Sequence, residues 1–67
     1  MKFIPIHNQT PTHQEWYLVK CPEYSPSGFQ IACWDDHIET WIDDLGSSKI
    51  DQYIIAYHPK PLNNHLS

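Results

Sequence analysis

Residues 35–46, which read Asp-Asp-His-Ile-Glu-Thr-Trp-Ile-Asp-Asp-Leu-Gly, decide the fold class of this 67-residue chain. As a helix, the segment would place apolar residues at positions i, i+3, i+4 and i+7 on one face: Ile38, Trp41, Ile42 and Leu45. Gly46 would then stand where a glycine commonly ends a helix. As β-structure, residues 35–38 would form a turn and residues 39–43 would return beside the preceding strand. These local signals leave both structures open.

The sequence on either side of this segment is typical of short β-strands. Residues 29–34 alternate with a period of two, and residues 15–21 and 52–58 are rich in aromatic and β-branched side chains before a proline. Residues 3–7 contain a proline, which confines them to a sheet edge. The polar, proline-containing stretches 8–14 and 22–28 are predicted loops.

The predicted hairpin of residues 16–21 and 29–34 determines how far apart the two cysteines lie. In that hairpin Cys21 would lie opposite Phe29, and Cys33 would lie opposite Tyr17. The stagger between the cysteines is then about 13 Å, whereas a disulfide needs Cα atoms within about 7 Å. We therefore expect free thiols.

Length and composition indicate one small domain that spans residues 1–67. A chain this short buries only about 60% of its unfolded surface, so its core depends on large side chains. Nine aromatic residues supply them: Phe3, Trp16, Tyr17, Tyr24, Phe29, Trp34, Trp41, Tyr53 and Tyr57.

Charge excludes several classes of partner. The chain has eight acidic residues, four lysines and no arginine, for a net charge of −4. The lysines are scattered, so the chain lacks the basic patch with which proteins bind nucleic acids directly or bind anionic membranes. No apolar run reaches the length of a membrane span, and the first residues lack a signal-peptide pattern. We expect a cytoplasmic protein.

Catalytic and metal-binding patterns are weak. The candidate metal ligands are Cys21, Cys33, His37 and His58, and they lack the closely spaced pair typical of zinc sites. Adjacent carboxylates in a turn are usually both exposed, and no segment resembles a nucleophile elbow. We expect no enzymatic activity, no cofactor and no bound metal.

From Trp34 onward, the order of features resembles a family of short domains of unknown function found mainly in phage and prophage genomes. An apolar strand ends in Trp34-Asp35-Asp36, and there follow Trp41-Ile42-Asp43, a turn at Gly46 and the close His58-Pro59-Lys60-Pro61-Leu62. Phe3-Ile4-Pro5-Ile6 corresponds to the family's opening, and residues 16–19 correspond to its second strand.

The resemblance implies a phage or prophage origin and a compact antiparallel β-domain in which residues 35–46 form a hairpin. We therefore predict an all-β fold, a small antiparallel sheet or meander of four to five strands. The alternative is an α+β fold with a helix at about 36–45.

Acidic residues are concentrated in one part of the chain. Six of the eight lie in residues 35–51, opposed only by Lys49. Such a segment either keeps a small domain in solution or, with a nearby tryptophan as anchor, meets a basic surface of a partner. For the second case we expect the contact residues Trp34, Asp35, Asp36, Glu39, Asp43 and Asp44.

The functional hypothesis is a non-enzymatic protein that binds and inhibits a host protein with a basic surface. The host protein would be a defence factor or a nucleic-acid-handling factor, because a nuclease or other nucleic-acid-handling protein offers a basic surface. The first alternative is a structural protein that self-associates through a free sheet edge, for example as a homodimer. The second is a metal-binding module built from the cysteines and histidines above.

Overall fold

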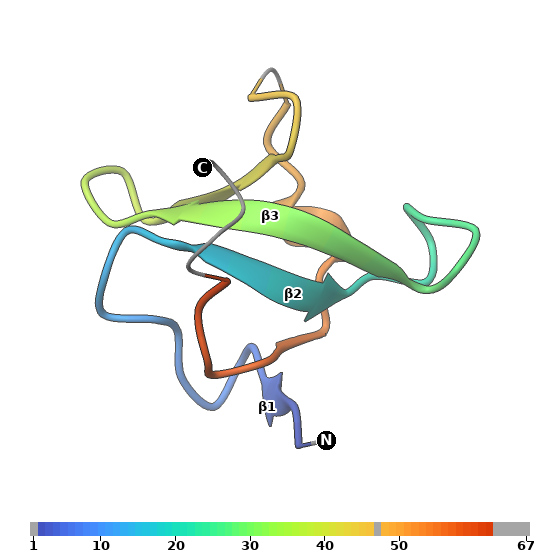
Figure 1. Cartoon of the computed structure of the whole chain (residues 1–67), viewed down its shortest axis with the longest axis horizontal. Coiled ribbons are helices and arrows are strands. Elements are labelled where there is room, and N and C mark those ends of the chain that lie inside the picture. Colours follow the sequence, from blue (N-terminus) through green and yellow to red (C-terminus); the bar gives the residue numbers. More distant parts are fainter. Residues whose placement is uncertain (1, 47, 63–67) are drawn as a thin grey trace.

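The structure, a computed structural model, describes residues 2–46 and 48–62, which form one open antiparallel sheet (Figure 1). The strand order is β1-β5-β2-β3-β4. The elements along the chain are β1 (Ile4–Pro5), β2 (Trp16–Lys20), β3 (Phe29–Asp35), β4 (Thr40–Asp43), the 3₁₀ helix η1 (Asp51–Tyr53) and β5 (Ala56–Tyr57). The predicted all-β fold is confirmed. Strands β2, β3 and β4 form a meander, whereas β5 lies between β1 and β2.

The helix alternative for residues 36–45 is wrong, because residues 36–39 form the turn between β3 and β4. At the start of that turn, Asp35 Oδ1 accepts hydrogen bonds from the backbone N–H groups of His37 and Ile38, at 3.0 and 3.4 Å. Such a bond offers the backbone a turn in place of a helix. Two residues of the helical pattern, Ile38 and Leu45, are 56% and 82% exposed.

The β2–β3 pairing differs by one residue from the predicted register. Cys33 lies opposite Trp16, and Cys21 donates its backbone N–H to the carbonyl of Gly28 at 2.9 Å. A shift of one residue exchanges the faces of a strand. Tyr17 therefore shares a face with Ala32 instead of Cys33. Both cysteines are free thiols; Cys21 is buried, and Cys33 is half-buried on the other face.

The predicted strand over residues 52–58 is only partly correct. Residues 51–53 form η1 instead, and the strand contains only Ala56–Tyr57. Before η1, the backbone at residues 48–50 runs antiparallel to β4, with a bridge between Lys49 and Ile42. The N–H of Ile50 donates to the carbonyl of Trp41 at 2.9 Å, which places Ile50 in the core.

The core lies on one face of the sheet, which we call the core face. Its buried members are Tyr17, Val19, Cys21, Ala32, Trp34, Trp41, Ile50, Ile54 and Tyr57. At its centre the rings of Tyr17, Trp41 and Tyr57 contact one another, with centroids 5.7–5.8 Å apart. Aromatic side chains thus supply most of the buried volume, as the composition predicts. Within the described residues, no helix has the length and apolar character needed to cross a membrane.

Candidate protein-interaction site

The acidic run of the sequence does not form one surface. Asp35, Asp36 and Glu39 lie at the β3–β4 turn, where β4 begins. Asp43 and Asp44 lie where β4 ends, about 13 Å away along a strand of four residues. The structure therefore divides the predicted contact residues into two groups.

Two of the six predicted contact residues are buried. Trp34 is 5% exposed and Asp43 is 3% exposed. The Asp43 carboxylate accepts hydrogen bonds from Tyr24 Oη at 3.2 Å and from the backbone N–H of Ser48 at 3.3 Å. Burial, together with the hydrogen bond to Asp43, raises the pKa of Tyr24. Asp43 therefore stabilises the turn after β4, and it offers no surface to a partner.

The remaining four acidic residues differ in their surroundings. Asp36, Glu39 and Asp44 are exposed, and Asp35 is half-buried beneath the turn that it stabilises. Asp44 Oδ1 accepts a hydrogen bond of 2.9 Å from Gln30 Nε2. The exposed carboxylates at the β3–β4 turn are thus those of Asp36 and Glu39.

A cavity of about 340 Å³ separates this turn from the loop before β2. The remaining exposed part of Trp34 lines it, between two carboxylates and a short proline-containing segment. The lining residues are Thr10, Pro11, Thr12, Trp34, Asp36 and Glu39. The cavity therefore combines an aromatic side chain with two negative charges, a pair of features that favours a cationic group.

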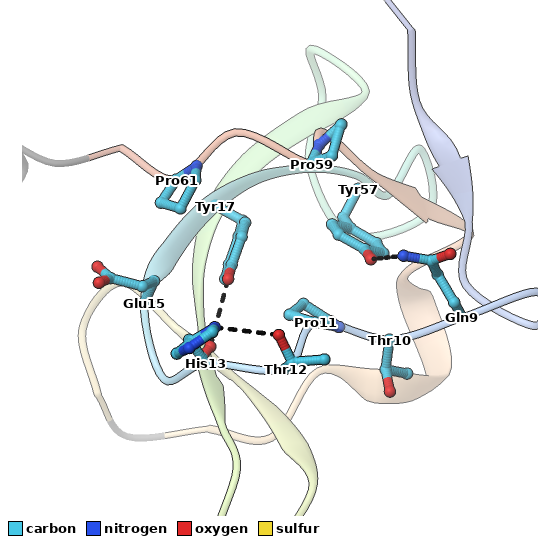
Figure 2. Close-up of a pocket in the computed structure, with 10 residues that line it drawn as sticks. All are labelled: Gln9, Thr10, Pro11, Thr12, His13, Glu15, Tyr17, Tyr57, Pro59 and Pro61. Carbon is cyan, nitrogen blue, oxygen red and sulfur yellow. Dashed lines mark hydrogen bonds between the residues drawn. The ribbon is translucent and has the colours of Figure 1, made fainter.

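A second cavity, also about 340 Å³, lies on the other side of residues 10–12 (Figure 2). Figure 2 shows the Tyr17 and Tyr57 hydroxyls facing the loop. Tyr17 Oη donates to the carbonyl of His13, and Gln9 Nε2 donates to Tyr57 Oη, both at 3.3 Å. The lining residues are Gln9, Thr10, Pro11, Thr12, His13, Glu15, Tyr17, Tyr57, Pro59 and Pro61.

Residues 10–12 line both cavities, whereas Glu15 lines only the second and contacts a lining residue of the first through its backbone. The Glu15 carbonyl accepts a 3.0 Å hydrogen bond from the N–H of Trp34, so the start of β2 lies against the end of β3. Burial raises the pKa of Tyr17, and the neighbouring Glu15 carboxylate raises it further. The Tyr17 hydroxyl is therefore neutral and remains a hydrogen-bond donor at physiological pH.

We call the two cavities, with the bordering carboxylates of Glu15, Asp36 and Glu39, the acidic groove. No lysine lines either cavity, and Lys20 lies at the far end of β2. The sequence pattern did not predict Glu15 or the loop residues as part of a site. Glu15 is twenty residues away from the acidic run, and only the β2–β3 pairing brings the two together.

The metal-ligand candidates lie apart. Cys21 and Cys33 are on opposite faces, His37 is exposed in the β3–β4 turn, and the His58 ring contacts that of Phe3 at 5.8 Å. In the described part of the chain, no three histidine, cysteine or acidic side chains form a group able to hold a metal ion. The geometry supports no metal site there.

The chain matches no family model, no curated protein and no solved structure. The resemblance to short phage and prophage domains stays a prediction.

Proposed function

We propose that this chain is a non-enzymatic protein-binding domain, and that its acidic groove receives a basic segment of a partner protein. Binding occludes the partner's basic surface and so inhibits it. In line with the resemblance to phage and prophage domains, the proposed partner is a host protein, such as a defence factor or a nucleic-acid-handling factor. Nucleic-acid-handling proteins carry the clustered lysines and arginines that neutralise phosphate.

The observation that carries this proposal is the cavity between the loop at residues 10–12 and the β3–β4 turn. The carboxylates of Asp36 and Glu39 border it, and Trp34 lines it. A lysine or arginine side chain gains mainly from the carboxylates, which pair with its charge, and the small exposed part of Trp34 adds an apolar contact for its stem. Both carboxylates are exposed, so each pairs with a partner's charge without first having to leave a buried hydrogen bond.

The distribution of charged residues also favours this end of the molecule as the binding site. Glu15, Asp36 and Glu39 surround the loop, and the lysines among the described residues lie outside both cavities. An uneven field of this kind steers an oppositely charged partner and sets its orientation. It also predicts that binding weakens as the salt concentration rises.

Two charge-reversal variants test the proposal in a pull-down from bacterial lysate at low and high salt. Asp36→Lys with Glu39→Lys reverses the charge of the acidic groove. Glu23→Lys with Asp44→Lys makes the same change in net charge on exposed residues away from it. We expect the first variant to lose a stoichiometric partner that the wild-type chain and the second variant retain at low salt.

Equal loss in both variants would show that net charge alone governs retention and would contradict the acidic groove as the site. Retention by both variants would also contradict it. Because Asp44 belongs to the control pair, the comparison separates the groove from the full set of acidic residues predicted from the sequence.

A further inference from the structure

The face of the sheet opposite the core is also apolar. Side chains alternate along a strand, so the residues between the core positions of β2, β3 and β4 point to this second face. We call it the apolar face, and its members are Leu18, Phe29, Ile31, Cys33 and Ile42. They form neighbouring pairs across the strands, such as Leu18 with Ile31 and Cys33 with Ile42.

The apolar face is not part of the core. The core cluster and the residues packed against it include none of its members. Phe29 is 41% exposed and its ring contacts that of Phe3 at 5.7 Å, and the other members are half-buried. A hollow of about 210 Å³ borders the face at Leu18 and is also lined by His58, Lys60, Pro61 and Leu62. A continuous apolar surface of this kind on a small domain marks an interaction site.

Opposite charges stand at the two ends of this face. Lys20 pairs with Phe29 at one end of the β2–β3 ladder. Asp35 pairs with Thr40 at the other end. The six-residue separation along β3 corresponds to about 20 Å. Lys20 and Asp35 therefore stand at opposite ends of the apolar residues. Lys60 borders the face beside Leu18, and Asp44 lies beside Gln30 near the Lys20 end.

We propose that the occupant of the apolar face is a second copy of this chain. A two-fold axis that lies in the interface and crosses the strands reverses the strand direction of the second copy. Lys20 of each copy then lies near the Asp35 end of the other copy. The contact occurs twice, as a two-fold interface requires. The orientation with parallel ends is disfavoured, because it sets lysine against lysine and carboxylate against carboxylate.

Size and edge structure favour the face over the sheet edges. An ordinary interface takes about 800 Å² from each partner, roughly a sixth of the 4579 Å² of accessible surface. The β1 edge has two residues, one of them Pro5, and the backbone of residues 48–50 pairs with the β4 edge. Neither edge offers a long run of unpaired backbone. Trp34, which lines the acidic groove, belongs to the core face, so the dimer leaves the groove accessible.

Sedimentation velocity of the full chain, from micromolar to millimolar concentration, tests this proposal. We expect a reversible dimer that Ile31→Glu weakens by about 100-fold, because two glutamates would be buried at the centre of the interface. Phe29→Glu provides a second variant at a more exposed position, in case Ile31→Glu fails to fold. The matched control is Ile38→Glu, at a 56% exposed position in the β3–β4 turn, and we expect it to dimerise as the wild type does.

Lys20→Gln and Asp35→Asn test the orientation, since asparagine keeps the oxygen that the turn amides require. We expect each change to weaken the dimer by about 3- to 10-fold, and the double variant to be no weaker than either single variant. If the effects of the two substitutions on the dimer dissociation constant simply add in the double variant, the pairing of Lys20 with Asp35 is overturned. A monomeric wild-type chain at every concentration would overturn the dimer. Dimerisation of a shorter chain ending at Leu62, with a monomeric wild type, would identify the residues after Leu62 as the occupant instead.

Discussion

Glu39 holds a backbone conformation that residues with a Cβ rarely adopt. Its φ is +52°, and it is the only non-glycine residue with a positive φ in the described part of the chain. The position closes the turn between β3 and β4, where the chain must reverse within four residues. A left-handed conformation costs an ordinary residue about 1–2 kcal/mol. The acidic groove thus contains a carboxylate held at some cost in stability.

Glu39→Gly should therefore raise the stability of the protein. We expect the free energy of unfolding to rise by about 0.5–1 kcal/mol, because glycine adopts the left-handed region freely but loses more entropy on folding. Urea unfolding followed by tryptophan fluorescence measures the change. Asp36→Gly, in the same turn but without a positive φ, should lower stability. A lower stability of Glu39→Gly would show that the turn does not carry this strain.

At the scale of elements, the contact between β4 and η1 depends on one carboxylate. Asp51, the first residue of η1, accepts hydrogen bonds from Thr40 Oγ1 and, at 3.0 Å, from the backbone N–H of Trp41. Thr40 is 7% exposed and Trp41 is 1% exposed, so water does not readily replace this acceptor. Asp51 thus connects η1 to the strand that carries the central core tryptophan.

Asp51→Ala should lower the free energy of unfolding by about 1–3 kcal/mol, because it leaves two donors at buried residues without an acceptor. Asp51→Asn keeps one acceptor oxygen and should lose about half as much. Urea midpoints of the three proteins give the comparison. If the alanine variant were as stable as the wild type, the Asp51 contacts would not hold η1 to β4.

At the scale of the whole molecule, the burial of two thiols and a tyrosine hydroxyl determines how the stability of the fold changes at alkaline pH. Burial raises the pKa values of the Cys21 and Cys33 thiols above the ordinary 9.0, and that of Tyr17 above 10.0. The unfolded chain therefore releases these protons at lower pH than the folded chain. The stability from keeping these groups protonated is intact below about pH 9 and is lost as the pH rises through the raised values.

We expect the urea midpoint to be constant near neutral pH and to fall above about pH 9. The slope should approach about 1.4 kcal/mol per pH unit for each group that is ionised only in the unfolded chain. Cys21→Ala should lower stability at all pH values but flatten the alkaline decline. A flat profile up to pH values above 10 in the wild-type chain would contradict the raised pKa values.

Local sequence patterns determined most of the elements. The two-residue period of residues 29–34 predicts β3, and the prolines mark the loops and the β1 edge, because these signals depend on neighbouring residues alone. The same patterns failed at residues 52–58, where η1 replaces part of the strand. They were also ambiguous at residues 35–46, where a helical period competes with an Asp35 turn. The resemblance to short phage and prophage domains favoured the hairpin there.

The candidate site was less accessible to sequence reasoning. Asp36 and Glu39 are found in the acidic run, but Asp43, four residues further on, is buried beneath Tyr24. Charge along a sequence does not state which side of a strand a residue occupies or what packs over it. Glu15 and the loop at residues 10–12 join the site only through the β2–β3 pairing.

The sequence by itself determined the strands on either side of residues 35–46, the negative charge and the aromatic composition of the core, whereas residues 35–46 were left open by their local pattern. Only the tertiary structure decided the strand register, and with it the face on which each side chain lies. A shift of one residue exchanges Tyr17 and Val19 with Trp16 and Leu18 between the two faces. Register is fixed by contacts between distant segments, such as Val19 opposite Tyr57 and the Tyr17 ring against the rings of Trp41 and Tyr57. For that physical reason the acidic groove and the apolar face emerge only in the folded chain.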